Sequence, residues 1–515
     1  MRSAVRQNLA LACGATFAFL WVVARACVQS VTIDEADTFL AYVAPQAPTH
    51  WLGSANNQLL NSLLMRLTTS VFGVSHLTLR TPALIGAAIY IAAAYIVARA
   101  IARRNSIAVP LLACLVLNPF VMDHLVAARG YSLALGLWMA MLAMPLSAAL
   151  PPARACALAS LAAGLSFSAN FSFALVDAAT LLLVGAWAWR RGVRPGVIAG
   201  CTLPGLAAAL AISGSVLASW PRNQLVYGSH SLAELFDGIQ KCSLYELNPY
   251  LVNPPLRLAL ERVSCLLFPL LAAACLWRGT NSAVWHARRP AAFAAIGTAA
   301  IAAHWLLFRL AHVLLPKERT GVWIAPLLFL VAGSLAAVPG GGAFSRRAVA
   351  VMLACFACYF ACCLRLTYFR EWKWNAEMQQ AYRVLARYDH TRGLKEVIVN
   401  WRYTAALNYY RAASAEEEFA PVEPHLPPYP AGADAYVLYY PDEEEFIRRR
   451  HLKLAWYGRL SDTAVAIDRR LEEPPEAPLN RSDDSQSARR HRSAGLAGKA
   501  SRAASLQSAA DRTPR

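Results

Sequence analysis

Two adjacent carboxylates, Asp34 and Glu35, follow the first long apolar stretch of the chain by only a few residues, in Val31-Thr-Ile-Asp-Glu-Ala-Asp-Thr38. A carboxylate held at this place is suited to accept a proton from an attacking hydroxyl group. A solvated loop or a helix cap would explain the pair without any chemistry. We expect the catalytic role, because two acids so close to an apolar helix are costly to place.

Cations and polar side chains gather at three further places, each next to the end of an apolar stretch. The residues that we expect to bind a substrate or its phosphate are Asn57, Asp123, Arg129, Tyr131, Arg309, His312, Lys317 and Arg319. Arg and Lys can neutralise a phosphate as it leaves, and Arg can do so through two parallel hydrogen bonds. Snorkelling or headgroup contact is the alternative interpretation for the arginines.

The elements that must position these groups are membrane spans. The 515 residues are 57% hydrophobic and 16% charged, and apolar runs of about 20 residues, the length that crosses a bilayer, recur from Leu9 to about Leu366. The first run is no cleavable signal, because more spans follow it. We predict eleven helices, roughly at 9–28, 83–102, 107–121, 131–149, 155–169, 171–189, 195–219, 259–278, 291–312, 320–338 and 348–366.

Basic residues cluster in every second gap between these helices, which marks those gaps as cytoplasmic. The net charge of +18 therefore reflects topology, and we expect no nucleic-acid partner. An odd number of helices places the amino terminus inside and everything after Thr367 outside. The long outer loops are 29–82 and 220–258, and a tight break near Asn170 separates two helices.

Three domains follow from these changes in composition: a membrane domain at 1–366, a small soluble α/β domain at 367–473 and a disordered basic tail at 474–515. In the soluble domain we predict strands at 394–400, 435–440, 452–456 and 463–467, and helices at 375–388, 404–413 and across the charged run 443–450. In the first outer loop, leucines on one face of Gln58 to Phe72 predict an amphipathic helix. A helix in the membrane interface and a helix packed on the protein surface are equally supported.

Twelve cysteines lie almost entirely in or next to apolar stretches, so we expect no disulfide framework. Cys355, Cys358 and Cys362 share one helical face. Small apolar packing explains that spacing better than a metal site.

The order of several motifs resembles the GT-C superfamily of polytopic glycosyltransferases, which includes protein O-mannosyltransferases and the bacterial lipid A aminoarabinose transferase. The resemblance covers about residues 8–366. It is carried by the Asp34-Glu35 pair, Asn56-Asn-Gln-Leu-Leu-Asn-Ser-Leu-Leu64, Leu79-Arg-Thr-Pro-Ala-Leu84, Ala128-Arg-Gly-Tyr131 and Pro316-Lys-Glu-Arg319.

This resemblance implies an inner-membrane enzyme that transfers a sugar from a polyprenyl-phosphate carrier to a glycan, lipid or protein acceptor at the outer face. Asp34 would be the general base, supported by Glu35, and a single displacement would invert the anomeric centre. Arg129, Lys317 or Arg319 would stabilise the departing phosphate. Relatives often carry His where this chain has Gln58, which cannot serve as a normal metal ligand, so the use of a divalent metal stays open.

Two alternatives belong to other classes. A transporter or flippase of lipid-linked sugars would place its charges near the bilayer midplane and show an internal repeat, whereas here the charges lie at the outer ends of helices. A non-catalytic scaffold would leave those charges without a role.

The predicted orientation can be tested with a cysteine placed near Ala433. It should react with a membrane-impermeant thiol reagent added to intact cells, because everything after Thr367 is expected outside. Labelling that occurs only after lysis, measured against the parent protein, would reverse the orientation and move the acid pair to the cytoplasmic face.

Overall fold

The computed structural model describes residues 2–44, 54, 56–102, 104–147, 149–220, 227–244, 285–338, 343–414 and 419–471. The chain divides into two compact units. The membrane unit comprises Met1–Gln29 and Trp51–Arg370, and the sheet unit comprises Ser30–His50 and Glu371–Arg515. The tail at 474–515 and the predicted helix at 259–278 lie outside the described residues.

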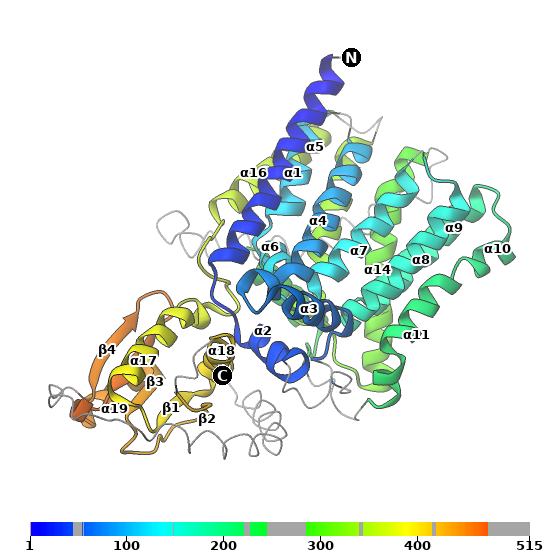
Figure 1. The fold of residues 1–515 in the computed structure, drawn as a ribbon. Coiled ribbons are helices and arrows are strands. Elements are labelled where there is room, and N and C mark those ends of the chain that lie inside the picture. The colour runs from blue at the N-terminus through cyan, green and yellow to red at the C-terminus, as the bar shows by residue number, and fades with distance from the viewer. Residues whose placement is uncertain are drawn as a thin grey trace. The chain divides into compact units, whose positions relative to one another are not determined.

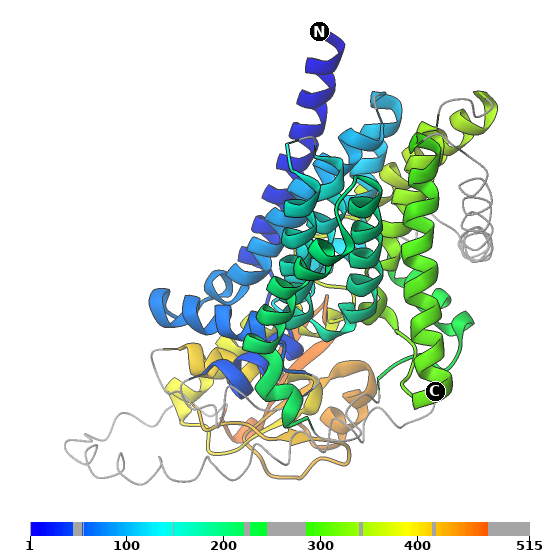
Figure 2. The ribbon, with the colours of Figure 1, turned by 90° about the vertical axis from the view of Figure 1, so that its right-hand side faces the viewer.

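Helices make up the membrane unit, and they run side by side in Figures 1 and 2. The helices are α1 (Arg2–Val28), α3 (Leu59–Phe72), α4 (His76–Ile101), α5 (Asn105–Leu117), α6 (Pro119–Val126), α7 (Tyr131–Ala143), α8 (Pro152–Ala169), α9 (Ala174–Arg190), α10 (Pro195–Gly200), α11 (Leu203–Ala218), α12 (Leu232–Ser243), α14 (Trp285–Ala311), α15 (Ile324–Ala337) and α16 (Ala343–Cys362). Short 3₁₀ segments lie at Met144–Leu146, Phe171–Phe173 and Glu318–Gly321.

A helix occupies each of the ten predicted spans that the structure describes. Within the described residues, six helical segments are long and apolar enough to cross a membrane, and the bent pair α5 and α6 makes a seventh if it is one span. The fold is therefore that of an α-helical polytopic membrane protein with a small α/β unit, as predicted.

Two local breaks move helix ends away from their predicted positions. The predicted span 107–121 instead ends at Leu117, and α6 follows at an angle of 52°. Pro119 explains the break, because a proline disfavours helical geometry at the residue before it, here Asn118. The side chain of Asn118 then caps the new helix by accepting hydrogen bonds from the backbone N–H groups of Phe120 and Val121. The stretch 122–130, expected to be a loop, is consequently helical as far as Val126.

The predicted break at Asn170 is present. Its backbone is extended, and its Oδ1 accepts a hydrogen bond of 3.0 Å from the N–H of Ser172, which starts the next turn. Helix α4, by contrast, begins at His76 rather than at 83. Ser75 and Thr78 form a reciprocal capping box that starts the helix before Pro82.

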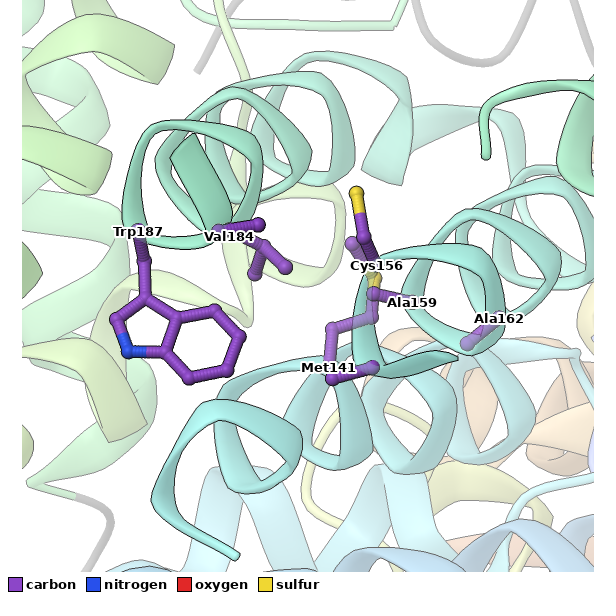
Figure 3. Packing of buried hydrophobic residues seen from close by; sticks show 8 residues of the cluster. Met141, Cys156, Ala159, Ala162, Val184 and Trp187 are labelled. Carbon is purple, nitrogen blue, oxygen red and sulfur yellow. The ribbon is translucent and has the colours of Figure 1, made fainter. Parts of the chain in front are cut away.

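Close backbone contact and apolar packing hold the helices together. A Cβ added to Gly86 in α4 would lie 2.4 Å from the backbone nitrogen of Leu133 in α7, and one added to Gly136 would lie 2.4 Å from the carbonyl oxygen of Gly86. Helices in membranes use such small residues to approach closely. Figure 3 shows an apolar cluster contributed by α7, α8 and α9, which includes Met141, Cys156, Ala159, Ala162, Val184 and Trp187.

The sheet unit contains a five-stranded sheet with the order β2-β1-β3-β5-β4. Its strands are β1 (Val397–Asn400), β2 (Pro424–His425), β3 (Ala435–Tyr439), β4 (Lys453–Gly458) and β5 (Thr463–Ile467), and its helices are α17 (Met378–Arg392), α18 (Trp401–Ala413) and α19 (Tyr440–Arg449). β1 is parallel to both β2 and β3, whereas β5 is antiparallel to β3 and β4. Each predicted strand and helix of this unit has an observed counterpart, and β2 was not predicted.

Residues 30–44 also fold with the sheet unit, although the sequence analysis placed them in the first outer loop of the membrane domain. They form α2 (Ile33–Thr38) and a π-helical turn, Phe39–Val43. The backbone N–H of Val31 donates to the hydroxyl of Tyr410 at 2.8 Å, and that of Ile33 donates to Oδ1 of Asn375 at 2.9 Å. The ring of Phe39 packs edge-on against Tyr409. The acid pair is thus held by α18 and by the segment before α17.

A substitution at Gly86 tests the close contact between α4 and α7. Gly86→Ala should lower the free energy of unfolding by about 1–3 kcal/mol or more, the usual cost of overpacking. The added methyl group meets backbone atoms, which cannot rotate away. Gly214→Ala in α11 is the matched control, since a Cβ there meets nothing within 4 Å. Thermal unfolding of both purified variants should separate them, and equal midpoints would show that α4 and α7 do not approach this closely.

Candidate functional site

The acid pair lies in the first turn of α2, and both side chains are buried. Asp34 is 9% exposed and Glu35 is 0% exposed. Oε2 of Glu35 accepts a hydrogen bond of 3.0 Å from the backbone N–H of Thr32, while the N–H of Glu35 donates to Oγ1 of Thr32 at 3.2 Å. This reciprocal pair is a capping box, which starts the helix by satisfying two backbone donors.

The two acids therefore differ in what their carboxylates do. Glu35 fixes the start of α2, which was the alternative to a chemical role that the sequence left open. The Asp34 carboxylate is outside the capping box, and the backbone carbonyl of Asp34 accepts the hydroxyl of Thr38 at 2.9 Å. The capping box fixes the first turn of the helix and with it the position of the Asp34 backbone.

In the membrane unit, Asn57 and Arg129 lie where α3 begins against the turn Ala127–Gly130. Asn57 is fully buried and its Oδ1 accepts the hydroxyl of Ser62 at 3.1 Å. Arg129 is 3% exposed, and its Nη2 donates to Oδ1 of Asn56 at 3.4 Å. A buried guanidinium next to amide side chains is a candidate anion site.

Gly130 sets the shape of this turn. Its φ is +73°, and a Cβ at this position would lie 2.1 Å from the carbonyl oxygen of Ala169. Tyr131, which begins α7, is 4% exposed and packs edge-on against the ring of His124, 5.0 Å away between centroids. Only a glycine fits here, and the turn that it forms places Arg129 and Tyr131 on either side of the close contact with the end of α8.

Asp123 lies in a different environment from the one predicted. Its Oδ1 is 2.5 Å from Nη2 of Arg25, its Oδ2 accepts the backbone N–H of Arg370 at 3.0 Å, and the acid and Arg25 are both buried. Arg25 also donates to the carbonyl oxygen of Tyr368. Asp123 stays a predicted substrate-binding residue, and these contacts give it an ion-pair partner within the protein.

A second buried arginine, Arg80, completes this network. Its Nη1 donates to the carbonyl oxygens of Ala26 and Gln29, at 3.1 and 2.7 Å. The guanidinium carbons of Arg25 and Arg80 each lie 5.3 Å from the centre of the Phe369 ring. Cations above an aromatic ring are attracted by its quadrupole. We call Arg25, Arg80, Asp123 and Phe369 the arginine network.

Lys317 and Arg319 meet at one tyrosine. Nζ of Lys317 lies 5.8 Å from the ring centre of Tyr227, and the guanidinium carbon of Arg319 lies 4.9 Å from it. The Tyr227 hydroxyl donates to Glu318 at 2.9 Å. Glu318 has a φ of +45°, a strained value for a residue with a side chain. The segment Lys317–Arg319 thus places two cations near the Tyr227 ring and a carboxylate at the Tyr227 hydroxyl.

Arg309 and His312 are exposed and belong to neither group of cations. Arg309 lies near the end of α14 with its guanidinium 5.8 Å from the ring centre of Trp305, and His312 has a φ of +56° just beyond that helix. The structure therefore brings Asn57, Arg129 and Tyr131 together at one turn, and Lys317 and Arg319 together at Tyr227. Tyr227 was not predicted, because only its contacts with distant segments single it out. Arg80 appeared only within the motif Leu79-Arg-Thr-Pro-Ala-Leu84 and was given no role.

No group of three His, Cys, Asp or Glu side chains that could hold a metal ion occurs among the residues that the structure describes.

The chain is similar in structure to ArnT from Cupriavidus metallidurans. The apo structure of that protein has 12% sequence identity and a TM-score of 0.37, and covers 90% of this chain and 99% of its own. Its structure bound to undecaprenyl phosphate has 11% identity and a TM-score of 0.35, and covers 89% of this chain and 97% of its own. No family model matches the sequence. No curated protein sequence matches it either.

Breaking the ion pair between Arg25 and Asp123 should destabilise the membrane unit. Asp123→Asn leaves a buried guanidinium without its counter-charge, which costs about 3–5 kcal/mol. Replacing both partners, with Arg25→Met and Asp123→Leu, should recover much of this loss because no charge then stays buried. Unfolding of the purified variants in urea measures the differences.

Asp237→Asn is the matched control, because Asp237 pairs with Lys241 at the surface of α12. Its effect should stay within about 0.5 kcal/mol. An Asp123→Asn protein as stable as the parent would contradict a structural role for this acid.

Proposed function

We propose that this chain transfers a glycosyl group from a polyprenyl-phosphate-linked sugar to an acceptor at the outer face of the inner membrane. The amino terminus is cytoplasmic and the sheet unit extracytoplasmic in this proposal. It rests on the motifs that resemble the GT-C superfamily and on the arrangement of α3.

The observation that carries the proposal is the apolar surface that α3 exposes toward its carboxyl end. Its polar side chains Asn61, Ser62 and Thr69 are buried against the membrane unit. Its apolar side chains Leu67, Val71 and Phe72 are 58%, 62% and 75% exposed. Leu59 and Met65 are buried as well, and the exposed apolar side chains form a surface that suits the acyl region of a bilayer or an isoprenoid chain.

The amino end of the same helix lies next to Arg129. A ligand that suits both ends of α3 is apolar along its length and anionic at its head, which describes a polyprenyl phosphate. Arg129 supplies a bidentate donor for the phosphate, and Lys317 and Arg319 supply two further cations. The proposal therefore assigns these three residues to the phosphate of the donor.

Asp34 is assigned as the general base. The acceptor hydroxyl oxygen attacks the anomeric carbon while its proton passes to the Asp34 carboxylate. The bond between the anomeric carbon and the phosphate oxygen breaks, and its electron pair leaves with the polyprenyl phosphate. Cations stabilise the negative charge that gathers on the leaving oxygen. One displacement of this kind inverts the anomeric centre. Glu35 supports Asp34 by capping the helix that holds it.

A flippase of lipid-linked sugars is the second candidate, and one observation favours it. Asp177 in α9 is 3% exposed and lies near the hydroxyl of Ser166 in α8. Acidic side chains inside spans often belong to translocation pathways. A flippase moves its lipid without breaking the sugar–phosphate bond, so release of polyprenyl phosphate separates the two candidates.

The test uses the purified protein, a mixture of polyprenyl-phosphate sugars and a cell-envelope extract that supplies glycan, lipid and protein acceptors. Release of free polyprenyl phosphate is followed by mass spectrometry. Asp34→Asn should lower the rate by about a hundredfold or more, which is the typical contribution of a positioned base. Glu35→Gln keeps an oxygen that can accept from Thr32 and should retain most of the activity. Asp37→Asn, in the same helix, is the control. An active Asp34→Asn protein would remove Asp34 from the chemistry.

A further inference from the structure

Three buried amide residues that the proposed mechanism does not use lie at the turn Ala127–Gly130 or directly after a residue that contacts it. Gln58, Asn61 and Asn170 are between 0% and 5% exposed. Nδ2 of Asn61 donates to the carbonyl oxygen of Ala128 at 3.1 Å. A Cβ at Gly130 would lie 3.1 Å from Cβ of Gln58 and 2.1 Å from the carbonyl oxygen of Ala169, which precedes Asn170. We call these three residues the amide cluster.

Each of these amides has one buried polar atom without a hydrogen-bond partner in the described structure. These atoms are Oε1 of Gln58, Oδ1 of Asn61 and Nδ2 of Asn170. A buried polar atom left in this way costs free energy, and native proteins leave few of them. Gln58 stands at the cap position of α3, yet its side chain makes no capping hydrogen bond. These three atoms belong to residues at or next to one turn, which makes them candidate contacts for a ligand.

For Asn61 and Asn170, the hydrogen bond made by one amide atom determines whether the other atom, which has no partner, is the oxygen or the nitrogen. Asn61 must direct its nitrogen at the Ala128 carbonyl oxygen, because two oxygens would repel, so its remaining atom is an acceptor. Asn170 directs its oxygen at the N–H of Ser172, so its remaining atom is a donor. The cluster thus offers both acceptors and a donor.

We infer that the amide cluster binds the hydroxyl groups of a neutral sugar. A hydroxyl group both donates and accepts, so sugar hydroxyls can pair with the two amide oxygens as well as with the amide nitrogen. A phosphate only accepts and would face the two amide oxygens. An ammonium group only donates, and the nearby guanidinium of Arg129 repels it. The inference rests on the proposed function, because the cluster would hold the sugar next to the phosphate that Arg129 binds.

The binding experiment uses the full chain in lipid nanodiscs and three probes with the same octyl tail: an octyl glucoside, an octyl glucosaminide and octyl phosphate. The wild type should bind the glucoside about tenfold more tightly than Gln58→Met does, since the loss of one hydrogen bond to a buried polar group is worth about this factor. Its affinity for octyl phosphate should not change. Gln58→Glu should shift preference toward the glucosaminide, because the new carboxylate attracts its ammonium group.

Gln7→Met is the matched control. Gln7 lies near the start of α1 and is also a buried amide. Its Nε2 donates to the carbonyl oxygen of Ala102, directly after α4. If Gln58→Met does not fold, the comparison of Gln58→Glu with the wild type still measures sugar preference. A wild type that binds all three probes equally, or a Gln58 variant with unchanged preference, would overturn the inference and leave water as the partner of these atoms.

The two proposals fail in different ways. Sugar-selective binding that depends on Gln58, together with no release of polyprenyl phosphate, would keep the amide cluster as a sugar site and refute the glycosyl transfer. Release that depends on Asp34, together with an unchanged sugar preference in the Gln58 variants, would keep the transfer and refute the cluster.

Discussion

The ion pair between Arg25 and Asp123 holds together the part of the membrane unit where the chain leaves it, after Gln29 and after Arg370. A charge buried in apolar surroundings requires a partner, so the pair fixes α1 and α6 against each other and against the segment 368–370. Arg80 holds the last turn of α1 from the other side through the Gln29 carbonyl. The chain passes into the sheet unit directly after Gln29 and again directly after Arg370. Both crossings therefore start from one buried network.

The same requirement explains why neighbouring polar residues take different roles. Glu35 satisfies backbone donors at the start of α2, and this leaves Asp34 on a fixed helix with its carboxylate outside the cap. At the other turn, Asn57 is engaged by Ser62, whereas Gln58 beside it keeps an oxygen without a partner. In both pairs, neighbouring polar residues differ in the contacts that fix the local structure.

Local patterns were sufficient for most of the elements. The apolar runs predicted the spans, and the turn at Asn170 followed from one polar residue between two such runs. The sequence analysis did not foresee that Asn118 and Pro119 break α5 from α6, because the apolar pattern continues through them. The β2 strand has only two residues and carries no periodic signal.

The candidate site was harder to predict because its contacts join distant segments. Arg25 and Asp123 are 98 positions apart, and Asp123 alone looks like any acid at the end of a span. Residues 30–44 follow a span, and only their contacts with Asn375, Tyr409 and Tyr410 show that they fold with the sheet unit. The amide cluster could not be predicted either, since the sequence does not show whether Gln58 is buried or exposed.

Gly130 has a consequence for how this protein can vary in evolution. Any amino-acid replacement there adds a Cβ, which meets the Ala169 carbonyl oxygen in a backbone conformation that already disfavours side chains. The amides around it carry no such restriction, because none of them has a positive φ. Homologous chains should therefore keep the glycine while exchanging Gln58, Asn61 and Asn170. A lineage could in this way acquire a new sugar preference without rebuilding the turn.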